Sequence, residues 1–175
     1  MEEILKNIKA LIFDVVGVMT DGGLISDADG SLYRVYNAKD RFGIRMAILG
    51  GYKVGCITGA NGSSVVNTLK STGIKEEDIY LLSRNKIEDF NDFCQRNSIK
   101  PEEVMYFVDD LPDLSIIKAA GIGACPCDAV DEVKEASDFV STYPGGKSFI
   151  RNAIEMVMKA QGKWTFDVEG YTKKF

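Results

Sequence analysis

LIFDVVGVMTD, residues 11 to 21, is the stretch that decides how this chain folds. Lys9 to Asp14 is a short apolar run of strand length that stops on an acid, and Gly17 then permits a tight turn. In an open parallel sheet, the carboxyl ends of the strands face the ligand crevice. We therefore expect Asp14 to point into a site, the alternative being that its side chain only caps the following turn.

Composition excludes several classes of function. The chain has 175 residues, a length typical of one domain with a full core, so a single domain over residues 1–175 is expected. Its net charge of -5 at pH 7 argues against a general binder of nucleic acid or anionic membrane, because such binders need a basic surface. Histidine is absent, which leaves carboxylates and lysines for acid–base work.

The four cysteines predict no metal site. Cys56, Cys94, Cys125 and Cys127 form no CxxC pair, and Cys125-Pro126-Cys127 has the wrong spacing for zinc. We expect buried, reduced thiols of an intracellular protein. The N-terminus lacks a basic segment followed by an apolar one, and no apolar run reaches membrane-spanning length, so the sequence predicts a cytoplasmic protein.

Strand and helix patterns alternate along the chain. This alternation predicts the α/β class, with a Rossmann-like, mainly parallel sheet that has helices on both faces. A small β-hairpin insertion is predicted over residues 22–36, because Asp29-Gly30 supplies the chemistry of a tight turn. The aromatic tail, residues 162–175, has no clear period and is either a loose end or an arm for a partner. Strands are predicted over 9–14, 52–58, 78–82, 104–108, 121–125 and 139–141, and helices over 40–49, 63–71, 85–97, 114–120, 130–136 and 148–160.

Chemistry-bearing residues follow four of these strands. They are Asp14, Thr58, Lys86 and the pair Asp109-Asp110, with Asp113 just beyond. Carboxylates are ligands that Mg²⁺ prefers, and an aspartate can accept a phosphoryl group. A lysine, a hydroxyl and the Gly59 amide can neutralise the phosphoryl oxygens. The set therefore predicts a magnesium-dependent phosphoryl-transfer site.

The same segments carry a family resemblance. Phe13–Val18, Ile57-Thr58-Gly59, Asn85-Lys86 and Val108–Asp113 resemble the four motifs of the haloacid dehalogenase superfamily of phosphatases. The resemblance is closest to the cap-less 3-deoxy-D-manno-octulosonate 8-phosphate phosphatases and runs from about Lys9 to Lys163. It implies a phosphatase for a phosphorylated 2-keto-3-deoxy sugar acid, in lipopolysaccharide biosynthesis. It also implies a homotetramer in which hairpins form the core and C-terminal tails reach neighbouring active sites.

The resemblance assigns a role to each motif residue. Asp14 is implied to be the nucleophile and a Mg²⁺ ligand, together with the backbone carbonyl of Val16 and the carboxylate of Asp109. Asp110 is implied to hold a metal-bound water, while Thr58 and Lys86 bind the phosphoryl oxygens. Four residues are placed on the substrate side: Asn37, Asp40, Arg41 and Arg45.

Four positions depart from the family pattern. Val16 stands where the family has the aspartate that protonates the leaving oxygen and activates water. Ala60 and Thr68 stand where it has arginines, and Val108 where it has a glycine, so that Val108 is expected to add bulk beside the metal loop. Arg84, Asp21 and Arg41 are candidates to compensate, each with a plainer alternative as a solvated or turn-capping residue.

Three hypotheses follow. The first is a magnesium-dependent phosphatase that works through an aspartyl-phosphate on Asp14. The second, suggested by the four departures, is a catalytically impaired pseudo-phosphatase that acts as a binding or assembly module. The third is a different chemistry on the same scaffold.

Overall fold

A six-stranded parallel sheet forms the centre of the computed structural model, which describes all 175 residues. The strand order is β5-β4-β1-β6-β7-β8, and every pairing in the sheet is parallel. The predicted α/β class is therefore confirmed, and all six predicted strands are present. Their bounds are β1 (Ala10–Phe13), β4 (Lys53–Ile57), β5 (Ile79–Tyr80), β6 (Val104–Phe107), β7 (Ile122–Cys125) and β8 (Phe139–Val140).

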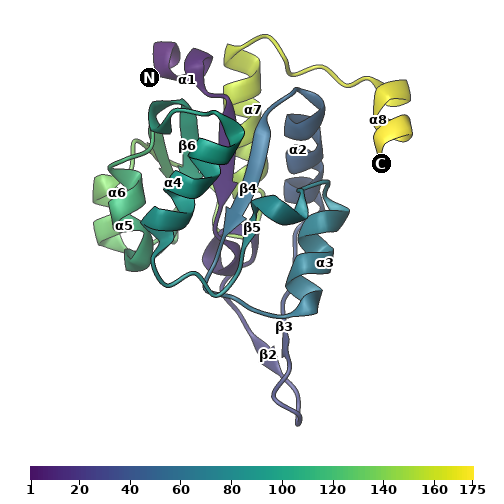
Figure 1. Ribbon diagram of the computed structural model, residues 1–175, viewed down its shortest axis with the longest axis vertical. Helices are drawn as coiled ribbons and strands as arrows, with labels where there is room; N and C mark the ends of the chain where they lie inside the picture. The colour runs from purple at the N-terminus through teal and green to yellow at the C-terminus, as the bar shows by residue number, and fades with distance from the viewer.

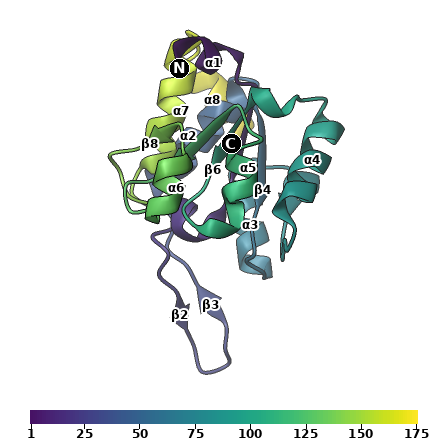
Figure 2. The same cartoon turned by 90° about the vertical axis from the view of Figure 1, so that its left-hand side faces the viewer.

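Helices cover both faces of the sheet, as Figures 1 and 2 show. One face carries α1, α2, α3 and α7, and the other carries α4, α5 and α6. The six predicted helices are all present, whereas the terminal helices α1 and α8 were not predicted. The bounds are α1 (Glu2–Asn7), α2 (Ala38–Leu49), α3 (Ser63–Ser71), α4 (Lys86–Asn97), α5 (Leu114–Ile117), α6 (Asp131–Ala136), α7 (Phe149–Ala160) and α8 (Val168–Lys174).

Alternating side chains of the central strands feed two hydrophobic clusters. In β1, Leu11 and Phe13 join the cluster under α2 and α7, while Ile12 joins the cluster under α4 and α5. All three side chains are fully buried. Because both faces of a parallel sheet are covered, its central strands read as continuous apolar runs, which is why residue 14 stands out as the first acid.

The predicted hairpin is present as β2 (Ile25–Ser26) and β3 (Leu32–Tyr33), paired antiparallel. It leaves the body of the molecule directly after the β1 loop and projects away from it in both views (Figures 1 and 2). Ile25, Tyr33 and Val35 are exposed on it. Exposed apolar side chains on a hairpin are typical of interaction surfaces.

The aromatic tail folds back on its own chain. Arg45 of α2 donates to the hydroxyl of Tyr171 at 2.9 Å, and its guanidinium lies 4.8 Å from the ring centre of Phe175. Phe42 packs against Phe166 and Tyr171, with ring centres 5.5 Å apart in each case. Within one chain, therefore, the tail binds α2 and is not a loose end.

Two further points concern the cysteines and the length of the helices. Every cysteine is free, but Cys127 is exposed, so the expectation that all four thiols are buried is wrong. None of the helices combines the length and the apolar character needed to cross a bilayer.

Candidate active site

Residues from four strand ends converge on one cavity of about 350 Å³. Asp14 follows β1, Thr58 follows β4, Lys86 begins α4 and Asp109 follows β6. The strands are parallel, so their carboxyl ends meet at one edge of the sheet, the edge from which the hairpin leaves (Figure 1). The cavity is lined by Asp14, Val16, Thr58, Gly59, Ala60, Ser83, Arg84, Lys86, Asp109, Asp110, Pro112 and Asp113.

Lys86 joins two carboxylates at the floor of this cavity. Its ammonium donates to Asp14 Oδ2 at 2.7 Å and to Asp113 Oδ2 at 2.8 Å, and all three residues are buried. Burial disfavours the charge of Lys86, but the two carboxylates outweigh it and raise the pKa of the ammonium. Burial also raises the pKa of Asp113 to about 6 against the pull of Lys86. The positive charge of Lys86 is therefore already shared between two acids.

Asp14 is held at both carboxylate oxygens. Oδ1 accepts from its neighbouring amide, Val15 N, at 2.6 Å, while Oδ2 faces Lys86. The turn-capping alternative is thus correct for one oxygen, and the side chain still reaches into the cavity. A carboxylate fixed in this way has a defined direction of attack on a group bound above it.

Thr58 presents a free hydroxyl hydrogen to the cavity. Its side-chain oxygen accepts from Ala60 N at 3.1 Å, so the oxygen is occupied as an acceptor and the hydroxyl can donate elsewhere. The residue is 1% exposed, which fixes it at the floor with Asp14 and Lys86. Gly59 follows it in the cavity wall.

The carboxyl group of Asp109 has no hydrogen-bond or ion-pair partner within the chain. Its side chain makes no hydrogen bond or ion pair, and burial together with the nearby charge of Asp14 raises its pKa to about 7. It also lies so close to the loop after β1 that a Cβ built on Gly17 would be 1.8 Å from Asp109 Oδ2, and Gly17 has a positive φ of 79°. Glycine is thus required at position 17 by both the backbone and the carboxylate.

A divalent cation fits this donor set. The carboxyl groups of Asp14 and Asp109, of which the second has no partner, offer hard oxygen ligands of the kind that Mg²⁺ prefers. No group of three His, Cys, Asp or Glu side chains is arranged to hold a metal. Val16, whose main-chain carbonyl the family resemblance implies as a ligand, lines the same cavity. Asp110 lies at the exposed rim, where its side chain accepts from Leu111 N at 2.8 Å.

The four departures lie in different surroundings. Val16 and Ala60 line the cavity, so neither place offers an acid or a cation. Thr68 is in α3, outside the residues that line the cavity. The expectation that Val108 adds bulk at the metal loop is wrong, because its side chain is fully buried in the cluster under α4 and α5. It continues the alternation of the buried side chains of β6.

The residues predicted on the substrate side lie elsewhere in the chain. Asn37 caps α2 through bonds from Lys39 N and Asp40 N. Arg41 donates to the hydroxyl of Ser71. Arg45 donates to the backbone carbonyl of Ser71 and to the hydroxyl of Tyr171. None of the four predicted residues lines the cavity around Asp14, and their contact with a substrate stays a prediction.

Asp40 links two helices. Its carboxylate accepts from Ser148 N at 3.1 Å and from Arg151 N at 2.8 Å, so an acid of α2 caps the N-terminus of α7. Ser148 cannot do this itself, since it has a φ of 80° and makes no side-chain cap. Burial, which outweighs these bonds, raises the pKa of Asp40.

We expect Asp40→Ala to lower the free energy of unfolding by about 2 kcal/mol, because a helix cap and two buried hydrogen bonds are lost together. Denaturant unfolding followed by circular dichroism measures this change. Asp29→Ala, at an exposed hairpin position, is the matched control and should leave the stability unchanged. Equal stability of both variants would contradict the capping role.

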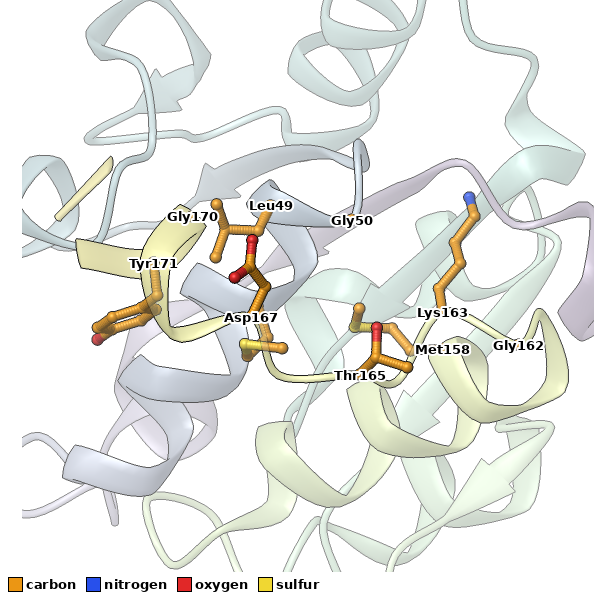
Figure 3. Close-up of a pocket in the computed structure, with 10 residues that line it drawn as sticks. Leu49, Gly50, Met158, Gly162, Lys163, Thr165, Asp167, Gly170 and Tyr171 are labelled. Atoms are coloured by element: carbon orange, nitrogen blue, oxygen red, sulfur yellow. The ribbon is translucent and has the colours of Figure 1, made fainter. Parts of the chain in front are cut away.

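A larger cavity, of about 430 Å³, shares no lining residue with the acidic one. Figure 3 shows it between the C-terminal end of α2, the end of α7 and the tail that crosses to α8. Met46 and Met158 are buried in its floor, and Lys163 and Asp167 are its charged groups. Asp167 is its only carboxylate, whereas the smaller cavity brings together four aspartates and a buried lysine, so the smaller acidic cavity is the stronger candidate site.

Three residues contribute more to the site than the sequence indicates: Tyr106, Ser83 and Asp113. Tyr106 donates to Asp113 Oδ1 at 2.5 Å and thus extends the network that ends on Asp14. The hydroxyl of Ser83 donates to Asp89, which fixes the loop before α4. Asp113 was visible in the acidic cluster, whereas Tyr106 reads only as one more apolar residue of β6 and gave no signal.

Comparisons with known proteins identify the family. A family model described as haloacid dehalogenase-like hydrolase matches residues 60–145. The 3-deoxy-D-manno-octulosonate 8-phosphate phosphatase of Haemophilus influenzae is 32% identical over 176 residues, which is 99% of this chain and 96% of that protein.

Two solved structures have the same fold. A putative haloacid dehalogenase superfamily hydrolase of subfamily III A from Legionella pneumophila gives a TM-score of 0.93 at 30% identity, over 98% of this chain and 93% of that one. The phosphatase for 3-deoxy-D-manno-octulosonate 8-phosphate from Moraxella catarrhalis gives 0.89 at 26% identity, over 93% and 92%. That crystal holds a magnesium ion, a phosphate ion and a KDO molecule.

Proposed function

Because the chain belongs to the haloacid dehalogenase superfamily of hydrolases, in the branch of the 3-deoxy-D-manno-octulosonate 8-phosphate phosphatases, we propose that Asp14 accepts a phosphoryl group from a small phosphorylated substrate. The observation that carries the proposal is the meeting of Asp14, Thr58, Lys86 and Asp109 in one cavity. No cation other than Lys86 touches the nucleophile.

In the first step, Asp14 attacks phosphorus and the bond from phosphorus to the substrate oxygen breaks. Lys86 and the hydroxyl of Thr58 bind the phosphoryl oxygens as charge builds on them. Asp113 and Tyr106 keep Lys86 in place beside Asp14. In the second step, water attacks phosphorus, the bond to Asp14 breaks and inorganic phosphate leaves.

Mg²⁺ would be held by Asp14, Asp109, the carbonyl of Val16 and water near Asp110, and it supplies charge neutralisation for the phosphoryl group. The proposal draws support from the carboxyl group of Asp109, which lines the cavity with Asp14 and has no partner within the chain.

Val16 removes the side chain that would move protons. An alkoxide leaving group must then take its proton from solvent water, and the attacking water must give its proton to solvent. General acid–base catalysis contributes about 10² to 10⁴ in rate, so both steps are slow on ordinary sugar phosphates. The native chain is in this proposal a weak phosphatase.

The substrate class is proposed from the relatives. We propose a phosphorylated 2-keto-3-deoxy sugar acid, because relatives named for that activity match nearly the full chain. We also propose a single cytoplasmic domain that assembles as a homotetramer through the exposed hairpin, with tails exchanged between neighbours. Light scattering tests the assembly, and a monodisperse monomer would contradict it.

Magnesium is expected to raise the melting temperature of the native protein by several degrees at millimolar concentration, because an ion that binds only the folded state stabilises it. Thermal melts with and without Mg²⁺ measure the shift. Asp109→Asn should remove most of the shift, while Asp138→Asn, at an acid outside the site, should keep it. A shift that survives in Asp109→Asn would place the ion elsewhere.

Phosphate release from a panel of sugar phosphates, with Mg²⁺ and with a chelator, tests the function itself. The proposal expects slow release that depends on Mg²⁺ and on Asp14. The second candidate function, a pseudo-phosphatase acting as a binding module, is favoured by Val16 and Ala60 in the cavity wall. It expects binding of the phosphates without any release above that of Asp14→Asn.

A further inference from the structure

Only two cationic side chains line the acidic cavity, and they lie at different depths. Lys86 is at the floor and is already bonded to Asp14 and Asp113. Arg84 is exposed at the mouth and makes no hydrogen bond or ion pair within the chain. Arg84 is therefore the one cation of the cavity that makes no ion pair within the chain.

The backbone around Arg84 is held in a fixed position. On its N-terminal side, Leu82 N donates to Ala60 O at 3.1 Å and Ser83 N donates to Thr58 O at 3.0 Å. These two bonds tie the segment to the loop that carries the phosphate-binding hydroxyl. On its C-terminal side α4 begins at Lys86. Arg84 thus starts from a defined point beside Thr58.

The backbone also adopts an unusual conformation there. Leu82 has a φ of 51°, in the left-handed region that side chains other than glycine rarely adopt. A leucine in this region is a local cost that persists only where the surrounding structure enforces it, and such positions cluster at functional sites. The conformation turns the chain so that the next two residues line the cavity.

Depth in the cavity decides which part of a substrate Arg84 meets. The phosphoryl group must reach Asp14, which is 8% exposed at the floor beside Thr58. The part of the substrate that is not transferred then points to the mouth. The other charged group there, Asp110, already accepts from Leu111 N. An arginine fork at the mouth matches a planar carboxylate, which it can bind through two hydrogen bonds.

We infer that Arg84 is a specificity-determining residue, which selects substrates that carry a carboxylate on the part that is not transferred. The inference rests on the proposed function, because it takes Asp14 as the acceptor of the phosphoryl group. Ala60, which lies in the same wall, has no polar side chain and leaves Arg84 as the anion-binding group of that wall.

Two ligands that differ only in the carboxylate test this role. In 6-phosphogluconate the chain ends in a carboxylate, and in glucitol 6-phosphate it ends in a neutral alcohol. Calorimetric titration with Mg²⁺ into Asp14→Asn protein measures binding without turnover. We expect 6-phosphogluconate to bind about tenfold to a hundredfold tighter than the alcohol, the range for a hydrogen bond to a charged group.

Arg84→Gln in the same background should abolish this preference by weakening 6-phosphogluconate alone. Arg84→Lys should keep part of the preference, because it retains charge without the fork. Lys118→Gln, which removes an exposed charge outside the cavity, should keep all of it. Equal weakening of both ligands by Arg84→Gln would show that Arg84 binds the phosphoryl group, and no weakening of either would show that it binds neither; both results overturn the inference.

Turnover of the same two ligands by the protein with Asp14 intact separates this inference from the proposed function. A carboxylate preference in binding, without turnover above the Asp14→Asn protein, would leave the role of Arg84 standing and overturn the phosphatase. Turnover of both ligands at equal efficiency, without a preference in binding, would overturn the role of Arg84 and leave the phosphatase standing.

Discussion

Val16→Asp is expected to raise kcat on alkyl phosphates by about 10² to 10⁴, the range that general acid–base catalysis supplies. Position 16 lines the cavity two residues after Asp14, and its backbone has an ordinary φ of -74°. Asp and Val are close in volume, so the new carboxyl group can occupy the space of the valine. It would give a proton to the leaving oxygen and then take one from the attacking water.

The choice of substrate makes this prediction specific. A sugar phosphate leaves as a strongly basic alkoxide and gains most from an acid, whereas 4-nitrophenyl phosphate leaves as a stable anion and gains little. We therefore expect the gain in kcat/KM, which reports the transfer of the phosphoryl group to Asp14, to be larger on the sugar phosphate. Val16→Ala is the matched control, since it changes the packing without adding an acid, and it should leave kcat unchanged. An equal gain with Val16→Ala would contradict the account.

Asp14→Asn is expected to lower kcat by about 10⁴ or more, because the variant lacks the nucleophile and such losses reach this scale in other covalent enzymes. The effect is best measured in the Val16→Asp background, where the starting rate is high enough to show the full loss. Asp21→Asn is the control. Asp21 is an exposed acid that pairs with Lys147 at 3.6 Å and lies outside the residues that line the cavity.

A loss in Asp14→Asn that is no larger than the loss in Asp21→Asn would contradict the assignment. The thermal melts of both variants check that they fold. Asp14 and Lys86 form a buried ion pair, so Asp14→Asn leaves a buried ammonium with Asp113 as its only acid partner. A lower melting temperature of this variant is therefore expected and does not bear on its role as nucleophile.

The strands and the main site residues could be predicted because their signals are local. Each buried strand is an apolar run, and Asp14 and Asp109 are recognised as the first acids after such runs. Parallel pairing then brings the strand ends together without further information. The alternation in β6 would also have placed Val108 correctly in the core, had it been followed one residue past the strand.

Partners distant in sequence could not be predicted. Asp40 accepts hydrogen bonds from Ser148 and Arg151, which follow it in the sequence by 108 and 111 positions. Arg45 donates to Tyr171, which is 126 positions away. The residues next to Asp40 and Arg45 in the sequence do not show whether each charged side chain stabilises the fold or binds a ligand. The helix α8 has no buried residue, so it lacks the apolar stripe by which a helix is recognised.

Chemical trapping shows whether Asp14 accepts the phosphoryl group. Without a general base at position 16, the second step is slow, so the phosphorylated protein should accumulate. Native protein mixed with Mg²⁺ and acetyl phosphate, which needs no proton on its leaving group, is quenched in acid, digested and mapped by mass spectrometry. We expect a phosphoryl group on Asp14 that hydroxylamine removes and that Asp14→Asn lacks. Phosphate release with Asp14 unmodified, or a phosphoryl group on another residue, would contradict it.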